Sequence, residues 1–128
     1  MASQFFFIFF TRFVFNDQKN GLVYANDEPF TGISMRYYSN GNTESKTSYQ
    51  NGKKHGKATK WFENGLISYE STYVNGRPDG ISRSWWKDGK LRTKSNYIQG
   101  IANGDQYQFY QSGALFKKIH LVNGRESG

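Results

Sequence analysis

Residues 56–79 read GKATKWFENGLISYESTYVNGRPD, and this 24-residue segment decides the fold. Two runs rich in aromatic and β-branched residues flank Asn64-Gly65, and a second Asn-Gly pair, Asn75-Gly76, follows them. Asn-Gly between strand-like runs is a strong hairpin signal, because a type I′ turn needs positive φ at both central residues. The segment therefore predicts a β-hairpin with a two-residue loop.

The same pattern occurs four times without a gap. Glycines recur every 24 residues in three columns: Gly32, Gly56, Gly80, Gly104 and Gly128; Gly41, Gly65, Gly89 and Gly113; Gly52, Gly76, Gly100 and Gly124. Because one such unit cannot bury its apolar face alone, neighbouring copies stack. The predicted fold class is all-β, with tandem antiparallel β-hairpin repeats of 24 residues forming an elongated single-layer twisted sheet.

The chain divides into an apolar leader and a repeat domain. The leader, residues 1–15, contains the run FFFIFF at Phe5–Phe10, which is far shorter than the roughly 20 residues of a transmembrane helix. A degenerate signal segment and a capping strand are both open interpretations. The localisation, cytoplasmic or exported, stays open with them. The repeat domain is predicted for residues 16–128, with a degenerate copy at 16–31 and repeats at 32–55, 56–79, 80–103 and 104–128.

Alternation along the predicted strands assigns the side chains to two faces. Face one carries the columns Tyr38/Phe62/Trp86/Tyr110, Thr43/Ile67/Leu91/Leu115 and Tyr49/Tyr73/Tyr97/Leu121. Face two carries Tyr37/Trp61/Trp85/Phe109 and Glu44/Ser68/Arg92/Phe116. In this register three charged strand residues lie on face one and twelve on face two. Since burying an unpaired charge is costly, we expect face one to be the packed side.

The net charge of +7 is concentrated in residues 46–94, which hold eleven cations and four anions. Such a field attracts anionic partners, although surface charges also serve to keep a sheet soluble. A partner-binding surface is predicted on face two, formed by Tyr37, Trp61, Trp85, Phe109, Lys57, Arg83, Lys87, Arg92 and Lys94. The alternative is that each ring packs on its column neighbours while the long cationic stems cover the ring edges.

The sequence contains no constellation typical of catalysis or of metal binding. Cysteine is absent, and His55 and His120 are isolated in a turn and on the charged face. A metal site needs several convergent ligands, and no Gly-x-Ser-x-Gly elbow or glycine-rich phosphate loop occurs. The sequence therefore predicts a protein that is not an enzyme and needs no cofactor or metal.

The pattern G-x4-[WYF]-[FYW]-x-N-G-x7-Y-x-N-G-K-x-x-G resembles the MORN repeat in the variant form common in bacteria, and the likeness covers residues 21–128. The resemblance implies an elongated sheet of hairpins. Bacterial relatives are often labelled antitoxin components of toxin–antitoxin systems, and eukaryotic relatives serve as scaffolds, dimerisation modules or proposed phospholipid binders.

From the residues and the resemblance together we predict a non-enzymatic repeat protein that mediates protein–protein binding, in an antitoxin-like or scaffold role. The expected partner is an acidic or extended protein segment. Edge-to-edge pairing of two copies is a variant of this mode. The alternative is peripheral binding to an anionic phospholipid membrane through the basic aromatic face, and nucleic acid is disfavoured.

Overall fold

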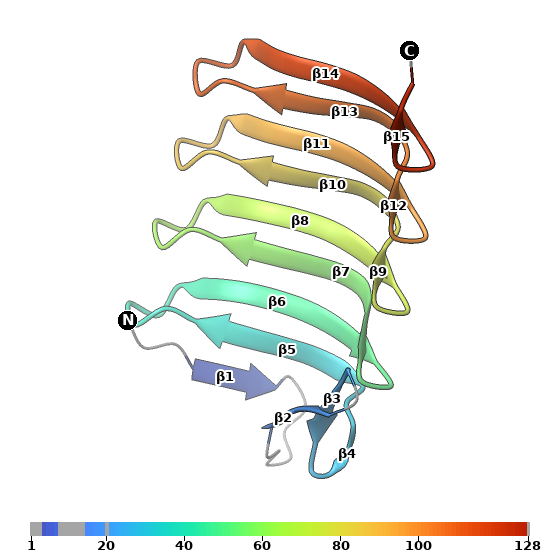
Figure 1. Ribbon diagram of the computed structural model, residues 1–128. Coiled ribbons are helices and arrows are strands. Elements are labelled where there is room, and N and C mark those ends of the chain that lie inside the picture. Colours follow the sequence, from blue (N-terminus) through green and yellow to red (C-terminus); the bar gives the residue numbers. More distant parts are fainter. Residues whose placement is uncertain (1–3, 8–14, 20, 128) are drawn as a thin grey trace.

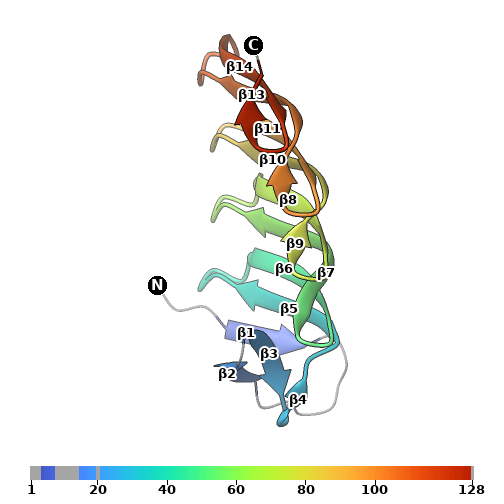
Figure 2. The same ribbon diagram turned by 45° about the vertical axis from the view of Figure 1, so that its right-hand side comes forward.

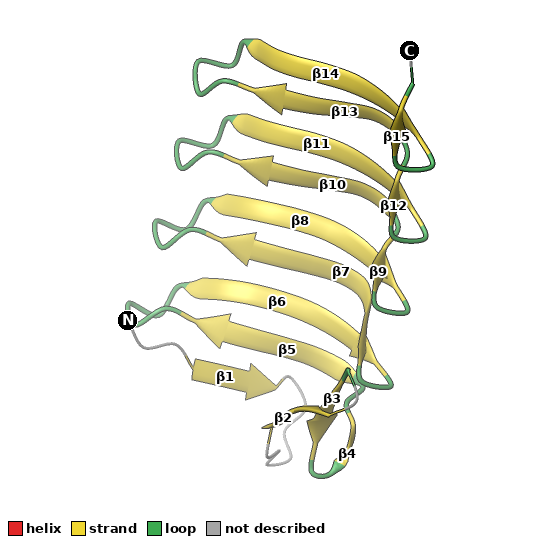
Figure 3. Cartoon of the chain, viewed as in Figure 1, coloured by secondary structure: helices red, strands yellow, loops and turns green. Residues whose placement is uncertain are grey.

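The computed structural model describes residues 4–7, 15–19 and 21–127, which form strands and turns and contain no helix (Figure 3). The main sheet is twelve-stranded and antiparallel throughout. Its strands follow the order β1 (Gln4–Phe7), β5 (Gly32–Tyr37), β6 (Thr43–Gln50), β7 (Lys53–Trp61), β8 (Ile67–Val74), β10 (Gly80–Trp85), β11 (Leu91–Ile98), β13 (Gly104–Phe109), β14 (Leu115–Val122) and β15 (Arg125–Glu126). The short strands β9 (Arg77–Pro78) and β12 (Ile101–Ala102) pair with β8 and β11.

The predicted fold class is confirmed. The four hairpins β5-β6, β7-β8, β10-β11 and β13-β14 stack as one open layer, with the turns inside each hairpin along one side and the connecting turns along the other (Figure 1). In the second view, the short strands β9, β12 and β15 turn out of the line of the long strands, so the sheet bends beside the connecting turns (Figure 2).

The connecting turns have the predicted type I′ conformation, in which both central residues take positive φ. In the turn between β8 and β9, φ is 50° at Asn75 and 84° at Gly76. The glycine N–H of each connecting turn also donates to a carbonyl of the preceding turn region. These bonds run from Gly52 to Phe30, Gly76 to Lys54, Gly100 to Pro78 and Gly124 to Ala102, each at 2.8 Å. The glycines of the connecting turns therefore recur every 24 residues for two reasons, the conformation of the turn and the hydrogen bond to the preceding turn region.

The turns inside the hairpins differ from the prediction. Phe62 N–H donates to the Leu66 carbonyl at 2.8 Å, and Gly65 N–H donates to the Phe62 carbonyl at 2.9 Å. Gly65, with φ of 91°, is the one residue of this fully described turn with positive φ. This is a three-residue loop made of a type I turn and a glycine bulge. The Asn64 side chain favours it by accepting the Leu66 N–H at 2.9 Å.

The longer loop shifts the register near each hairpin turn. Lys60 pairs with Tyr69, whereas the next residue, Trp61, pairs with Ile67, so that Ser68 is bulged. The other three hairpins shift at the same place. The bulged residues are Glu44, Ser68, Arg92 and Phe116.

This bulge corrects the predicted faces of two columns. The Arg92 guanidinium lies 4.6 Å from the centre of the Trp86 ring, and the Phe116 ring packs edge-on against Tyr110 at 4.9 Å. The column Glu44/Ser68/Arg92/Phe116 therefore accompanies the rings of face one. Thr43, Ile67, Leu91 and Leu115 instead pair directly with the aromatic column of face two. Burial raises the pKa of Tyr38, and the nearby carboxylate of Glu44 raises it further, which fits this arrangement.

Burial follows the predicted packed side, but with small residues in place of the aromatic and aliphatic columns. Of the five buried residues of the long strands, Ser34, Ala58, Ser71 and Ser82 lie on face one and Thr59 on face two. In β8, for example, Ser71 lies between Tyr69 and Tyr73 on this face. The larger rings remain only partly buried, as a single layer requires.

Three short strands form a separate sheet at the N-terminal end of the stack: β2 (Phe15–Lys19), β3 (Leu22–Ala25) and β4 (Glu28–Pro29). Val23, Ala25 and Phe30 form a small buried cluster against Tyr49. Val23 N–H donates to the Gly52 carbonyl at 2.9 Å, which ties this cap to the first connecting turn. The cap thus occupies residues for which a degenerate repeat was predicted.

Strand β1 belongs to the predicted apolar leader and pairs antiparallel with β5 at the edge of the main sheet. Residues 1–3 and 8–14 of the leader lie outside the described part of the chain, as does Gly128 of the last repeat. The choice between a signal segment and a capping strand stays a prediction. Among the described residues, no helix is long and apolar enough to cross a lipid bilayer.

Candidate functional site: a basic aromatic surface on face two

Cross-strand partners form two parallel rows on face two. The aromatic row consists of Tyr37, Trp61, Trp85 and Phe109, each beside its partner in the next strand. The basic row runs through the middle of the strands from β5 to β14 and consists of Met35, Lys46, Thr59, Glu70, Arg83, Lys94, Tyr107 and Lys118. Successive members of the basic row are direct partners, and each aromatic residue lies two positions further along its own strand. The aromatic row and the basic row therefore run side by side along the stack.

A hollow of about 390 Å³ opens on this face between the first and second repeats. It is lined by Ile33, Lys46, Ser48, Lys57, Thr59 and Trp61. Thr59 is buried, whereas Lys46 and Lys57 are exposed, so an apolar wall and two cations surround the opening. This geometry suits an apolar side chain that is followed by an acidic one.

A second feature of the basic row is a pair of cations that face each other. Arg83 and Lys94 are direct partners on β10 and β11, and both are partly buried. Glu70 lies on the other side of Arg83, but among the described residues no ion pair joins either cation to a carboxylate. Like charges directly opposite each other are unfavourable in a sheet, so this point attracts an anionic group.

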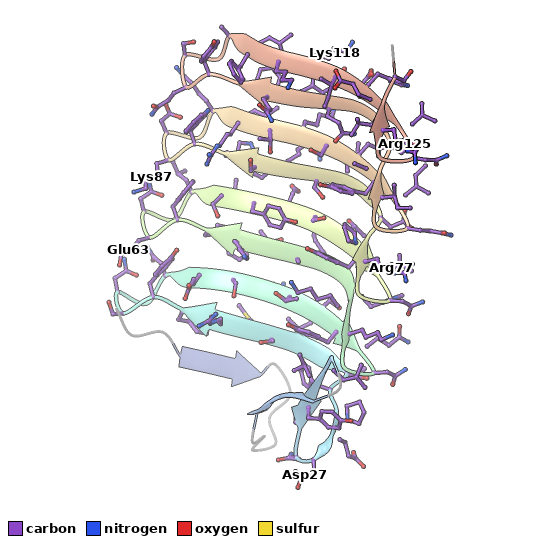
Figure 4. All side chains as sticks on the ribbon, in the orientation of Figure 1. Asp27, Glu63, Arg77, Lys87, Lys118 and Arg125 are labelled. Carbon is purple, nitrogen blue, oxygen red and sulfur yellow. The ribbon has the colours of Figure 1, made fainter. Side chains whose placement is uncertain are left out.

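The structure brings together seven of the nine predicted surface residues on face two: Tyr37, Trp61, Trp85, Phe109, Lys57, Arg83 and Lys94. Lys87 lies in the turn between β10 and β11, at the side of the sheet opposite Arg77 (Figure 4). Arg92 lies on face one over Trp86, because of the bulge. Lys46 was missed, since its contact with the hollow depends on the pairing between repeats, Lys46 with Thr59.

The last repeat interrupts the positive surface with an acidic group. Asp105 Oδ1 lies 2.7 Å from His120 Nδ1, and Asp105 Oδ2 lies 3.8 Å from Lys118 Nζ. The hydrogen bond from His120, more than the charge of Lys118, lowers the pKa of Asp105. The uncompensated positive charge of face two is therefore concentrated in the first three repeats.

The two histidines have identifiable structural surroundings. His55 Nδ1 accepts the Asn75 backbone N–H at 3.2 Å and so joins two consecutive connecting turns. His120 bonds to Asp105 as described. Within residues 4–7, 15–19 and 21–127, no group of three or more His, Asp or Glu side chains is arranged to hold a metal ion.

These features define a class of protein: an open stack of β-hairpins that offers long surfaces rather than an enclosed site. The MORN repeat variant model matches residues 30–51, 54–75 and 78–99, together just over half of the chain, and the chain belongs to this family. No curated protein matches the sequence. MORN repeats are generally linked to protein or membrane binding and are not typically enzymatic.

Proposed function

We propose that this chain is a non-enzymatic binding protein that docks another protein on face two. The observation that carries the proposal is the Arg83–Lys94 pair next to the aromatic row: the two cations face each other, and among the described residues neither forms an ion pair. A purely structural surface would gain stability by separating or neutralising these two charges. A partner carboxylate placed between them would remove the repulsion and leave both cations paired.

The spacing of the surface specifies the partner segment. The Trp61 hollow and Arg83 lie two strands apart along the row, which is roughly 10 Å at the usual strand separation. An extended chain covers that distance in about three residues. The expected partner is therefore an extended acidic segment with an apolar side chain about three residues from a Glu or Asp.

Such docking suits an antitoxin-like or a scaffold role, because both roles act by occupying the surface of a partner without chemistry. The family resemblance supports the same roles. Co-expression distinguishes them: an antitoxin-like protein restores growth when it is produced together with a toxic partner encoded beside it, whereas a scaffold does not. The docking surface itself is tested independently of the role.

The test is affinity capture from native cells with two charge-reversal variants. Lys57→Glu with Lys94→Glu changes face two, and Lys60→Glu with Lys117→Glu makes the same charge change on face one. Each charge at the surface, exposed as at Lys57 or partly buried as at Lys94, contributes roughly 0.2–1 kcal/mol, so we expect the face-two variant to bind its partner about tenfold more weakly. The face-one variant should bind like the unmodified protein.

Replacing aromatic residues tests the apolar half of the surface. Trp61→Ala with Trp85→Ala should weaken partner binding by at least roughly 30-fold, because one central tryptophan alone commonly contributes about 2 kcal/mol or more. Trp86→Ala removes the third tryptophan of the chain, which lies on face one, and should leave the affinity unchanged. Equal losses in the two variants would contradict docking on face two. Capture of no protein, together with sedimentation on anionic vesicles, would instead identify a membrane surface.

A further inference from the structure

A cavity of about 380 Å³ lies beside the connecting turns of the first two repeats, next to the N-terminal cap and away from the docking surface. Tyr49 and Tyr73 form its aromatic walls, and Lys53, Lys54, Arg77 and Asn75 line it from the connecting turns. The N-terminal cap closes one side through Val23, which packs with Tyr49. Nothing in the proposed docking mode uses these residues.

Three cations line this cavity, and within the described part of the chain no acidic residue does. Lys54 is the direct partner of Tyr49, and its Nζ lies 5.0 Å from the centre of the Tyr73 ring. The Lys53 stem lies across Gly76, and the Arg77 stem lies across Gly100 of the next connecting turn, at the bend (Figure 4). Among the described residues, none of the three cations forms an ion pair. The cavity is therefore a site of uncompensated positive charge.

The tyrosine walls add no negative charge. Burial raises the pKa of Tyr49, and burial together with the hydrogen bond to Tyr69 raises the pKa of Tyr73. The Tyr73 hydroxyl lies 3.3 Å from the Tyr69 hydroxyl. Both phenols therefore stay neutral and offer flat apolar surfaces with polar tips.

The repeat fold does not require this charge. Two repeats later, Ile101 and Ala102 stand at the positions of Lys53 and Lys54, and Arg125 stands at the position of Arg77. The same connecting turn forms there, with Gly124 N–H bonded to the Ala102 carbonyl at 2.8 Å. The cationic cavity is thus a local addition to a turn that forms equally well without it.

We infer that this cavity binds a small phosphate monoester. Lys53, Lys54 and the forked guanidinium of Arg77 would hold the phosphate oxygens, since Arg binds phosphate in a bidentate manner and Lys as a point charge. The organic part would lie between Tyr49 and Tyr73. The volume is at the lower end of the range of small-molecule sites, about 300–1,000 Å³.

The experiment titrates the full chain with phenyl phosphate and follows the Tyr49 and Tyr73 ring resonances by NMR at constant ionic strength. We expect saturable shifts of both rings with phenyl phosphate and none with uncharged phenol. Arg77→Gln and Lys54→Gln should each weaken binding at least about tenfold, because each removes a charge-assisted contact. Arg125→Gln removes the equivalent arginine of the last repeat and should leave binding unchanged.

Thermal unfolding of each variant separates loss of binding from loss of folding. No saturable shift in the folded unmodified protein, or equal affinity in Arg77→Gln and Arg125→Gln, would overturn the inference. Vesicles with and without phosphatidic acid identify the source of the phosphate. Binding to phenyl phosphate alone assigns a soluble ester, binding to both assigns a headgroup, and binding to vesicles alone excludes a small-molecule site.

Discussion

The second and fourth repeats have the same backbone and different surroundings. In both, the first strand pairs with the second in one register and shifts at the same place before the hairpin turn, between Lys60 and Trp61 and between Gln108 and Phe109. Both loops close with the same two hydrogen bonds, as from Tyr110 to Ala114 and from Gly113 to Tyr110 in the fourth. The hairpin geometry is therefore encoded within each 24-residue unit.

Burial differs between the two repeats. The second repeat buries Ala58, Thr59 and Ser71, with Ser71 only 2% exposed. In the fourth, Leu115 is 51% exposed and Phe116 is 55% exposed. Among the described residues, β15 alone pairs with the outer side of β14, at Leu121 and Val122. The comparison shows that local sequence forms the hairpin, whereas a neighbour on each side buries it.

The largest difference in the free energy of unfolding between an inner and the last repeat is expected when the glycines of the connecting turns are replaced. Gly52→Ala should lower the free energy of unfolding by about 4 kcal/mol, because it combines a positive φ with contacts to the cap. A Cβ there would lie 2.9 Å from Leu22 Cβ and 2.9 Å from the Val23 carbonyl oxygen. Gly124→Ala has the same unfavourable positive φ, but its added Cβ would contact only Ile101 Cγ2, at 3.3 Å. We therefore expect the free energy of unfolding to fall by about 1 kcal/mol.

Urea unfolding of both glycine variants measures the two free energies. Their similar φ values, 81° at Gly52 and 79° at Gly124, make each variant a control for the other. Equal losses would show that φ alone sets the cost, and the interior turn would then be no more constrained than the last one.

A smaller effect on the free energy of unfolding is expected when the middle residues of β8 and β14, the second strands of the two hairpins, are exchanged. Ser71 and Ile119 occupy equivalent positions, and the Ser71 hydroxyl is hydrogen-bonded to the Ser82 hydroxyl. Ser71→Ile should cost about 3 kcal/mol, because it overpacks a buried position and leaves Ser82 without this partner. Ile119→Ser should cost about 1 kcal/mol, since its side chain is only partly buried. Thermal unfolding checks both, and a larger loss at Ile119 would reverse the comparison.

The fold could be predicted from the sequence because its signals are local and repeated. The Asn-Gly pairs and the glycine period fix the hairpins, the connecting turns and the stacking. The turn inside each hairpin could not be fixed in this way, because Asn-Gly fits both a type I′ turn and a type I turn with a glycine bulge. The choice depends on the backbone of Asn64, whose side chain accepts the Leu66 N–H.

That choice also determines how much of the candidate site could be predicted. Trp61 and Lys57 lie in β7, the strand without the bulge, and both line one hollow. Arg92 is itself bulged and lies on the other face. The contact of Lys46 with the hollow depends on pairing between repeats, which a pattern within one repeat does not contain.

A stabilising change is expected where the third repeat departs from the second. Lys94 faces Arg83, whereas the equivalent residue of the second repeat, Glu70, faces Thr59. Lys94→Glu should raise the free energy of unfolding by about 0.5 kcal/mol, because it replaces a repulsive pair by an attractive one. The same variant should weaken partner binding. Lys117→Glu on face one is the control in urea unfolding, and a fall in stability with Lys94→Glu would contradict the proposed repulsion.

The smallest expected effect is on stability at acid pH, and it is confined to the fourth repeat. Lys57 and Thr72 occupy the second-repeat positions that Asp105 and His120 fill in the fourth. The pKa of Asp105 is held below its ordinary value of 3.8, chiefly by the hydrogen bond from His120. Its folded pKa thus lies below its unfolded pKa, so its contribution to stability is present above about pH 4 and is lost as the pH falls through the lowered value.

His120→Gln should therefore move the NMR titration midpoint of the Asp105 carboxyl upward, toward 3.8. It should also flatten the acid side of the stability profile. Thr72→Gln places the same amide in the second repeat, where no carboxylate stands opposite, and should leave the acid side unchanged. Because Asp105 and His120 are both exposed, added salt should reduce the effect. An unchanged Asp105 midpoint in His120→Gln would mean that the fourth repeat gains nothing from this pair and relies, like the second, on its neighbours.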